Sequence, residues 1–420
     1  MKIIIKKARV VDPNSPFNQQ IADILIEDGL IREIASTISE KADQEITGDD
    51  LHASPGWMDI FSNFADPGYE FKETLETGAA AAAAGGYTDV MVIPNTNPTV
   101  HNKATVEYII QKSKSLPVSI YPIGAVTKNT EGKELAEMYD MRASGAVAFG
   151  DGINSIQSAG LLLKALQYVK SFDGSIVQVP DDKSINPHGL MNEGIVSTQL
   201  GLPGKPIMAE ELIVARDIKL ARYAESKLHF TGISSAKSLE YIKRGKESGA
   251  AISCSVTPYH LFFTDEDITS YDTNLKVNPP LRTKEHRDAL RKAIADGTVD
   301  AIASHHLPQE YDSKVLEFEY AKNGMIGLET CYAVLNTCLP DIPQEKWVNL
   351  LSINPRALFA IEQPVIKKGN KASITLFEPN KQWTVTEKDI ASRSKNSPFI
   401  GKTLTGKIKG IITKSQAVIR

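Results

Sequence analysis

Cysteine is scarce in this sequence, which contains only three among 420 residues: Cys254, Cys331 and Cys338. The count is odd and the three residues are widely spaced, so a disulfide framework and a zinc knuckle are both excluded. We interpret all three as free thiols buried in a core.

Long apolar runs are also missing. No stretch approaches the roughly 20 apolar residues that a membrane-spanning helix needs. The apolar run Ile3–Ile5 is too short for the core of a signal peptide, and lysines flank it. The Ala- and Gly-rich stretch from Thr77 to Gly86 is followed at once by polar residues, so we expect a tightly packed helix there. The sequence therefore predicts a cytoplasmic protein without a membrane partner.

Basic residues form no cluster. The formal net charge is −4 and the pI is about 6.1, which argues against a nucleic-acid partner. The sequence also has no phosphate-binding loop, no dinucleotide-binding glycine motif and no G-x-S-x-G nucleophile turn. These absences leave small molecules or other proteins, including further copies of the chain in a homo-oligomer, as the expected partners.

What is present is the composition of a globular protein, with 42% hydrophobic and 23% charged residues. A chain of this length exceeds one small core, so we expect one large and one smaller domain. Both ends are rich in short β-type runs: Lys2–Val11, Asp23–Ile31, Ala372–Phe377 and Gly406–Thr413. Turn signals between the first runs predict hairpins. We therefore predict a small β-sandwich domain formed by residues 1–52 and 365–420.

Residues 53–364 alternate between strand-like and helix-like segments. The strand candidates are Trp57–Phe61, Asp89–Ile93, Val118–Ile123, Ala146–Phe149, Ser175–Val179, Lys227–Thr231, Ala251–Val256 and Ala301–Ala303. Helical runs separate them, for example Ala104–Lys114, Gly132–Arg142 and Ala209–Ser226. Seven or eight such units are typical of a closed (β/α)8 barrel, which we predict for this part of the chain.

In a barrel of this kind, catalytic residues lie on the loops that follow the strands. The first of these loops is framed by Pro55-Gly56 before its strand and by Asp66-Pro67-Gly68 after it. Polar side chains lie at or after the later strands: Asn95, Asp151, Gln178, Asp181, His229, Asn278, His305 and His306. The sequence therefore predicts one pocket at the carboxyl ends of the strands.

Further motifs follow one another along the chain. They are Pro94-Asn95-Thr96-Asn97-Pro98, Asn192-Glu193-Gly194, Ala209-Glu210-Glu211, Asn278-Pro279-Pro280-Leu281-Arg282, Gly327-Leu328-Glu329 and Ser394-Lys395-Asn396-Ser397-Pro398-Phe399. With the framed first loop, they resemble the class I (multifunctional-complex type) dihydroorotases of the amidohydrolase superfamily nearly end to end. The resemblance implies a (β/α)8 TIM-type barrel with a small flanking β domain, as the strand pattern also predicts.

The resemblance also implies a zinc ion that polarises the ring carbonyl and activates a water. The family's motif D-x-H-x-H-L-R begins here at Asp59. Phe61 and Asn63 stand at its two histidines, and Ala65 stands at the arginine that would bind the substrate carboxylate. Phe61 offers no lone pair, and the neutral amide of Asn63 binds zinc poorly.

The other ligand positions that the resemblance implies are also altered. They correspond to Asp151, Gln178, Gly232 and His305, and only Asp151 keeps an acidic candidate. His305 stands where the family has the aspartate that serves as metal ligand and general base. We therefore expect these degenerate positions to hold no metal and to supply no catalytic residue.

The pair His305-His306 is the most conspicuous remaining cluster. Adjacent residues on an extended segment point opposite ways. We expect one to line the pocket and the other to be hydrogen-bonded in its wall, with a rewired metal or acid–base site as the alternative. His260 is interpreted as structural, and His52, His101, His188 and His286 have no clustered partners.

Asn95 and Asn278 stand at positions that contact the substrate in the family. They are therefore the candidates for residual substrate binding, although structural support of their loops is the preferred interpretation.

Two functions from different classes remain. The preferred hypothesis is a catalytically silent dihydroorotase homologue, without a cofactor, that acts as a scaffold for aspartate transcarbamoylase in pyrimidine biosynthesis. The alternative is an active dihydroorotase or related cyclic-amide hydrolase, whose rebuilt site uses His305, His306, Asp151 and Asp181 and in which zinc is the expected cofactor. A protein that binds a small molecule in the old pocket is a third hypothesis.

Overall fold

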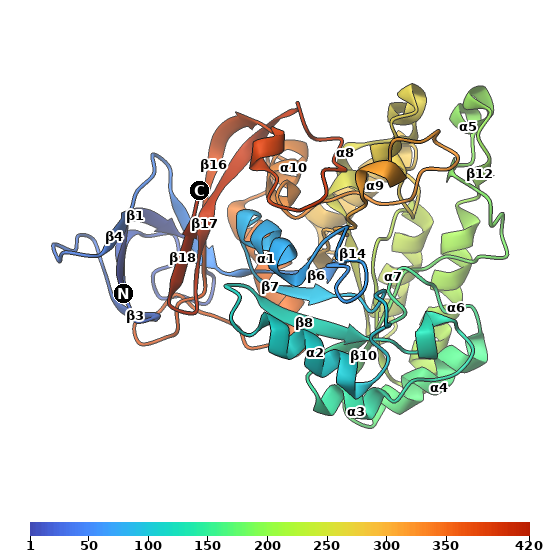
Figure 1. Ribbon diagram of the computed structural model, residues 1–420, viewed down its shortest axis with the longest axis horizontal. Helices are drawn as coiled ribbons and strands as arrows, with labels where there is room; N and C mark the ends of the chain where they lie inside the picture. The colour runs from blue at the N-terminus through green and yellow to red at the C-terminus, as the bar shows by residue number, and fades with distance from the viewer.

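Two eight-stranded sheets dominate the structure, a computed structural model that describes all 420 residues (Figure 1). One sheet is parallel and curls into a barrel with helices around it. The other is mainly antiparallel and is built from both ends of the chain. The predicted fold, a TIM-type barrel with a flanking β structure from the two termini, is confirmed.

The barrel sheet runs in the order β15-β14-β13-β10-β9-β8-β7-β6. Its strands are β6 (Trp57–Ser62), β7 (Tyr87–Val92), β8 (Ser119–Gly124), β9 (Ala148–Phe149), β10 (Ser175–Gln178), β13 (Lys227–Phe230), β14 (Ile252–Val256) and β15 (Ala301–Ile302). Apolar side chains from at least five of these strands meet in one buried cluster that includes Met58, Met91, Ile123, Val177 and Ala301. Each predicted strand is present, and the one expected at Ala146–Phe149 is shortened to two residues.

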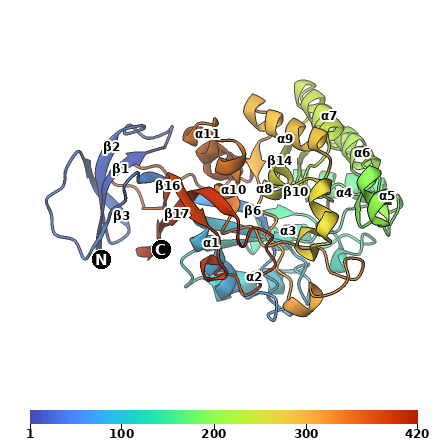
Figure 2. The same ribbon diagram turned by 90° about the horizontal axis from the view of Figure 1, so that it is seen from above.

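Helices follow most of the barrel strands and enclose the sheet (Figures 1 and 2). They are α1 (Leu75–Ala84), α2 (Lys103–Ser113), α3 (Met138–Ala143), α4 (Ala159–Lys170), α6 (Met208–Ala224), α7 (Ala236–Glu247), α9 (Lys284–Asp296) and α10 (Cys331–Cys338). Shorter helices are α5 (Ile195–Leu200), α8 (Pro258–Phe262), α11 (Gln344–Val348) and α12 (Asn354–Leu358). No helix is both long and apolar enough to cross a membrane.

The helix predicted at Gly132–Arg142 is wrong over its first half. The α-helix begins only at Met138, and a 3₁₀ turn, Lys128–Thr130, precedes it. Gly132, the first residue of the predicted range, has a φ angle of 70°, in the left-handed region, so a right-handed α-helix cannot begin there.

The small residues of α1 allow the close packing that their composition predicts. Thr74 caps the helix through a hydrogen bond from Thr77 N to its side chain. A Cβ atom added to Gly78 would lie 2.5 Å from Cγ of Phe64, so only glycine fits at this contact. The helix therefore lies directly against the loop that follows β6.

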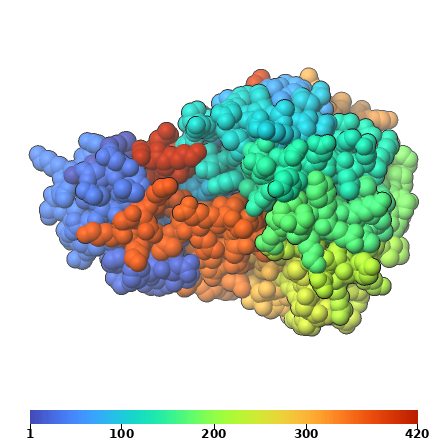
Figure 3. Space-filling model, turned by 90° about the horizontal axis from the view of Figure 1, so that it is seen from below, coloured from blue at the N-terminus to red at the C-terminus, as the bar shows by residue number.

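The terminal sheet runs in the order β18-β17-β16-β5-β1-β2-β3, with β4 also paired to β1. Its strands are β1 (Lys2–Val10), β2 (Ile21–Glu27), β3 (Leu30–Ala35), β4 (Gln44–Ile46), β5 (His52–Pro55), β16 (Ile374–Thr384), β17 (Thr403–Thr413) and β18 (Gln416–Ile419). Strand β5 pairs with β1 on one side and with β16 on the other, so it joins the two ends of the chain. In Figure 3 the orange and red C-terminal segments accordingly lie between the blue N-terminal residues and the barrel.

The carboxylate of Asp59 connects the first barrel strand to the segment that follows the last one. Its Oδ1 accepts a hydrogen bond from Ser304 N at 2.7 Å, and its Oδ2 accepts one from Ser62 Oγ at 2.6 Å. Next to it, Ser62 forms a parallel bridge with His306, and Asn63 N donates to His306 O at 2.8 Å. The barrel is thus nearly closed by a few contacts centred on one buried carboxylate.

Replacing Asp59 with Ala should destabilise the fold. The substitution leaves Ser304 N and Ser62 Oγ without their partner in a site with no exposure to solvent. A buried donor that loses a charged acceptor costs about 2–4 kcal/mol in the free energy of unfolding, measurable by urea titration. Asp140→Ala is the matched control, because Asp140 is exposed on α3 and its side chain forms no hydrogen bond or ion pair. Equal stability of the two variants would contradict this role of Asp59.

Candidate functional site

A cavity of about 250 Å³ lies at the carboxyl ends of the barrel strands, where the sequence predicts a pocket. Its wall comes from the ends of β6 and β10 and from the segments after β9, β14 and β15. The lining residues are Phe61, Ile153, Asn154, Val179, Lys183, Tyr259, Val277, Asn278, His305, Leu307, Gln309, Asn323, Gly324 and Met325. The mixture of apolar walls and a few polar groups is that of a site for a small molecule.

His305 is held on three sides. Its ring stacks on Phe61 with centroids 4.3 Å apart, and its Nε2 lies 2.7 Å from Thr231 Oγ1. On another side, a Cβ atom at Gly232 would lie only 2.6 Å from His305 Cε1. Burial, with smaller effects of His260 and His229, lowers the pKa of His305 to about 3. The ring is therefore a neutral imidazole near pH 7, and its Nδ1 has no partner in the protein.

His306 belongs to the wall. It is fully buried, its Nδ1 accepts a hydrogen bond from Gly327 N at 3.3 Å, and its Nε2 lies 3.4 Å from Glu73 Oε2. Burial opposes ionisation of Glu73, but hydrogen bonds from His306, Ser392 and Thr77 outweigh it and lower the pKa of this carboxyl group. The two histidines are thus separated, one in the pocket and one in an internal polar cluster.

The residues at the implied ligand positions are engaged elsewhere. Asn63 Oδ1 accepts a hydrogen bond from Ala65 N at 2.8 Å, inside its own loop. Gln178 Nε2 donates to Asp217 Oδ2 at 3.1 Å, and Gln178 Oε1 accepts from Ile156 N at 3.3 Å. Neither amide has the charge or the free geometry that zinc requires.

Asp151 is the one acidic candidate among these positions. Its oxygens accept hydrogen bonds from Thr127 N at 2.9 Å and from Thr127 Oγ1. Burial raises its pKa to about 6. Asp151 does not line the pocket, so it does not join His305 in one site.

The residues present do not fit the zinc site that the resemblance implies. Phe61 fills one ligand position with a ring, and Gly232 offers no side chain at another. No three His, Cys, Asp or Glu side chains of the chain are grouped so that they could hold a metal ion.

Asn278 lines the pocket and Asn95 does not. Asn278 Nδ2 donates to Asp181 Oδ2 at 3.4 Å, and Asp181 pairs with Lys205 at 2.6 Å in the adjoining wall. Asn95 instead joins two loops: its Nδ2 donates to Asp151 O, and its Oδ1 accepts from Ile153 N. The roles of both residues in substrate binding stay predictions. Only Asn278 lies where it could contact a molecule in the pocket.

Several polar lining residues were not singled out from the sequence. Lys183 is exposed at the pocket and donates to Asn154 Oδ1 at 2.9 Å. Gln309 is 8% exposed, and its Nε2 donates to Asn323 O, whereas its buried Oε1 has no partner. Gln309 ends the segment His305-His306-Leu307-Pro308-Gln309, and its closeness to His305 in the sequence is the signal that could have identified it. The pocket thus has a cation, an unpaired acceptor and an unpaired imidazole nitrogen.

Three residues of the quoted motifs meet beside the pocket rather than in it. Arg282 is fully buried and donates to Ser234 Oγ and Asn192 Oδ1, both at 3.0 Å. Glu210 accepts hydrogen bonds from the backbone of Ser234 and Ser235. This network holds together the loops that form one wall of the pocket.

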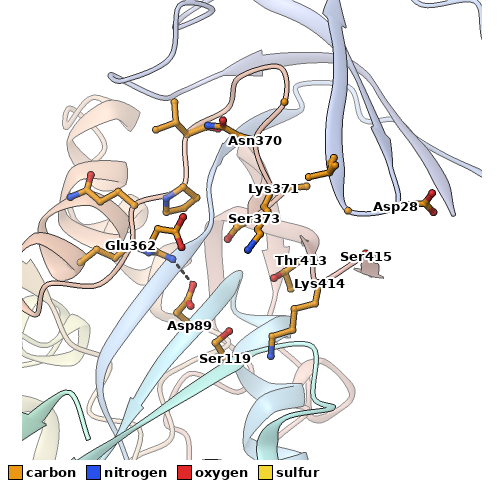
Figure 4. A pocket seen from close by; sticks show the side chains of 18 of the residues that line it. Asp28, Asp89, Ser119, Glu362, Asn370, Lys371, Ser373, Thr413, Lys414 and Ser415 are labelled. Carbon is orange, nitrogen blue, oxygen red and sulfur yellow. Dashed lines mark hydrogen bonds and ion pairs between the residues drawn. The ribbon is translucent and has the colours of Figure 1, made fainter. Parts of the chain in front are cut away.

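A larger cavity of about 890 Å³ lies between the terminal sheet and the barrel (Figure 4). It is bordered by Asp89 and Ser119 of the barrel strands and by Lys371, Lys414 and other residues of the terminal sheet. Arg356 pairs with Asp89 there, and Lys414 Nζ donates to Leu116 O. No side-chain polar atom that lines this cavity is both closed off from solvent and without a hydrogen-bond partner.

Comparison with known proteins gives a consistent family. The family model described as Dihydro-orotase-like matches residues 53–238. The chain is 39% identical over 415 residues to a protein named dihydroorotase from Syntrophus aciditrophicus, covering 97% of each chain. It is 37% identical over 424 residues to the dihydroorotase of Ruminiclostridium cellulolyticum, covering 100% of this chain and 99% of the relative.

Solved structures support the same architecture. The L-hydantoinase (dihydropyrimidinase) of Arthrobacter aurescens matches with a TM-score of 0.86 at 23% identity, covering 100% of this chain and 96% of the other. The dihydropyrimidinase of Brevibacillus agri matches with a TM-score of 0.84 at 19% identity. At these identities the likeness establishes the fold alone.

The expectation of a catalytically silent scaffold is wrong by the sequence comparison. Relatives that share 36–39% of their residues over nearly the whole chain are named dihydroorotase. The comparison therefore favours the alternative hypothesis of an active cyclic-amide hydrolase. The altered ligand positions determine how the site is built, and they do not by themselves decide whether it acts.

Gly232→Ala should displace His305 and destabilise the protein. Gly232 has φ +72°, and the new Cβ would lie 2.6 Å from the His305 ring. The left-handed backbone costs roughly 1–2 kcal/mol for a non-glycine residue, and the overlap adds about 1–3 kcal/mol. Gly201→Ala is the matched control, because Gly201 has φ +66° and no neighbour within 4 Å. Equal losses in urea unfolding would show that His305 does not occupy this space.

Stability should fall as the pH is lowered from 7 to 5. Mainly through burial, the pKa values of His229, His260 and His305 are lowered to about 3, 4 and 3. A lowered folded pKa gives stability that is complete above the unfolded value of about 6.5 and is lost as the pH falls toward the folded value. Asp151 and Asp217, with pKa values raised to about 6, bind protons in the folded state and offset part of this loss.

The net loss between pH 7 and pH 5 is on the order of 3 kcal/mol in the free energy of unfolding. Urea titrations at the two pH values measure it. His260→Gln removes one titrating ring and should reduce the dependence by about one proton. A protein that is more stable at pH 5 than at pH 7 would contradict the neutral state of these histidines.

Proposed function

The chain belongs to the dihydroorotase family, and on that premise we propose that it interconverts carbamoyl aspartate and dihydroorotate, or opens and closes a closely related cyclic amide, in the pocket beside His305. The observation that carries this proposal is the 37–39% sequence identity to proteins named dihydroorotase over nearly the whole chain. The pocket adds support through the complementarity of its polar groups to such a ring.

A cyclic ureide with a carboxylate presents three features to a protein: a ring N–H donor, a ring carbonyl acceptor and a negative charge. The pocket has a counterpart for each. Gln309 Oε1 is an acceptor without a partner, His305 Nδ1 is free to hydrogen-bond, and Lys183 carries a positive charge at the opening. Gln309 Oε1 is closed off from solvent, so a ligand N–H reaches it only when the side chain turns toward the cavity. A buried acceptor left unpaired is costly, so that pairing gains free energy on binding.

Ring opening requires water to add to the ring carbonyl, whose oxygen then becomes negatively charged. A hydrogen bond donated by His305 to that oxygen would strengthen as the charge develops, which lowers the barrier. Because its pKa is about 3, His305 acts near pH 7 as a neutral imidazole. A neutral ring held by fixed contacts can polarise a carbonyl without having to lose or gain a charge.

Turnover by the purified protein tests the proposal. Carbamoyl aspartate and dihydroorotate are each supplied as substrate, and the ratio of the two is followed by chromatography. We expect conversion in both directions and a fall in kcat of about 100-fold in His305→Gln, because a hydrogen bond to the developing oxyanion is lost. His188→Gln is the control, since His188 is exposed and lies outside the pocket.

Absence of conversion by the folded, unaltered chain would overturn the proposal. Full activity of His305→Gln would remove His305 from the mechanism while leaving the family assignment intact. Metal content measured on the same preparation, before and after a chelator that is followed by the same assay, shows whether the activity depends on an ion.

A further inference from the structure

Two neighbouring barrel strands carry polar side chains on one face. His229 and Thr231 are two residues apart at β13, and Ser253 and Ser255 are two residues apart on β14. The strands are parallel, with His229 paired to Ser253. Because side chains alternate along a strand, all four point to the same side of the sheet. Each is at most 9% exposed, so together they form a polar file inside an otherwise apolar barrel.

The four side chains and His305 are joined by consecutive hydrogen bonds. Ser253 Oγ lies 2.8 Å from His229 Nδ1, and Ser255 Oγ lies 3.0 Å from His229 Nε2. Ser255 Oγ donates to Thr231 Oγ1 at 2.9 Å, and Thr231 Oγ1 lies 2.7 Å from His305 Nε2. The chain of contacts is unbroken from Ser253 to the pocket.

The direction of one bond, together with the cost of leaving a buried hydroxyl proton without an acceptor, fixes the others. Ser255 has a single hydroxyl proton, which it donates to Thr231, so it must accept from His229 Nε2–H. The neutral His229 then accepts at Nδ1 from the hydroxyl of Ser253. Thr231 in turn donates its own proton to His305 Nε2. The neutral His305 therefore carries its proton on Nδ1, the nitrogen that has no partner in the protein.

The two ends of the file reach different cavities. His305 lines the pocket at the carboxyl ends of the strands. His229 and Ser253 line a second cavity of about 230 Å³, together with Ser175, Lys227 and Ala251. Ser175 and Lys227 are the first residues of β10 and β13, so this cavity lies at the amino ends of the strands. The file thus crosses the barrel between two openings.

We propose that the file Ser253–His229–Ser255–Thr231–His305 is a proton relay through the barrel, which sets the tautomer of His305 and delivers a proton to the pocket from water in the cavity at the amino ends. Ser253, His229, Ser255 and Thr231 are positioning and relay residues, and His305 is the residue that touches the substrate. The relay goes beyond the proposed function, but the role of the relay in turnover rests on that function.

The proton balance of the step is complete. When water adds to the ring carbonyl, the Nδ1–H bond of His305 breaks and an O–H bond forms on the carbonyl oxygen. His305 Nε2 takes the proton of Thr231, Thr231 takes that of Ser255, and Ser255 takes that of His229 Nε2. His229 Nδ1 takes the proton of Ser253, which is replaced from a cavity water. The hydroxide formed there is neutralised through bulk solvent by the proton that the attacking water releases, and ring closure runs the relay in reverse.

The tautomer is tested without reference to activity. Nitrogen-15 NMR of the full chain with labelled histidine reports which ring nitrogen carries the proton, and the His305 signals are assigned by their absence in His305→Gln. We expect the proton on Nδ1 in the unaltered chain and on Nε2 in Thr231→Val, which keeps the side-chain shape but removes the donor. Thr231→Ala removes the same donor and serves if Thr231→Val does not fold.

Ser238→Ala is the matched control, because Ser238 is also fully buried but its hydroxyl has no hydrogen-bond partner. It should leave the His305 tautomer unchanged. A proton on His305 Nε2 in the unaltered chain, or a tautomer that does not respond to Thr231→Val or Thr231→Ala, would overturn the relay.

Kinetics then test delivery of the proton. Ser255→Ala should lower kcat for dihydroorotate about tenfold to a hundredfold with KM unchanged, because proton transfer is impaired and substrate contacts are intact. Ser238→Ala should keep the original kcat. An unchanged kcat in Ser255→Ala would overturn proton delivery. Absence of turnover in the unaltered chain would overturn the proposed function and the delivery step with it, whereas the NMR result decides the tautomer in either case.

Discussion

The contact on which the rest of this structure depends is the buried carboxylate of Asp59. One group accepts hydrogen bonds from the backbone of the last strand's loop, from Ser62 on the first strand and from Phe61 N. Only an acceptor with two oxygens can do this, since an amide in its place would present a donor to one of these donors. Burial raises the pKa of Asp59, and the hydrogen bonds from those donors oppose this shift. The same contact fixes the backbone at Ser304, and with it the ring of His305. Closure of the barrel and formation of the pocket are therefore a single event.

The fold could be predicted because the apolar periodicity of each strand and helix is visible within a short stretch of sequence. The alternation of apolar strands and helical runs gave the barrel, and the Asp28-Gly29 turn gave one hairpin of the terminal sheet. The error at Gly132–Arg142 arose because composition does not reveal the left-handed backbone of Gly132. Helical periodicity predicts which face of a helix a residue would occupy, but it does not show at which residue the helix begins or ends.

The site was less predictable, because its groups come from segments that are distant in sequence. His305 was identified, but its stacking on Phe61 and its bond to Thr231 join residues separated by 244 and 74 positions. Gln309 and Lys183 have no pattern of their own and gain meaning only as neighbours of a cavity. The polar pairs at His229 and Thr231 and at Ser253 and Ser255 do alternate visibly in the sequence. What the sequence could not supply is the direction of the hydrogen bond between them. The comparison of zinc-ligand positions tests only zinc-dependent chemistry. For that reason it led to the wrong preference for a catalytically silent scaffold.

Because His305 contacts the backbone of Gly232, the residue that one of these positions tolerates depends on the residue at the other. The ring occupies the space that any side chain at 232 would need, so neither position can be changed toward a metal ligand by itself. A histidine or other ligand at 232 has room only after the ring at 305 is gone, and a smaller residue at 305 leaves a void against Phe61. Paths between this site and a metal-binding one therefore pass through less stable proteins, or require both residues to change together. The low stability of the single-substitution intermediates therefore preserves the present pair of residues, whichever reaction the site performs.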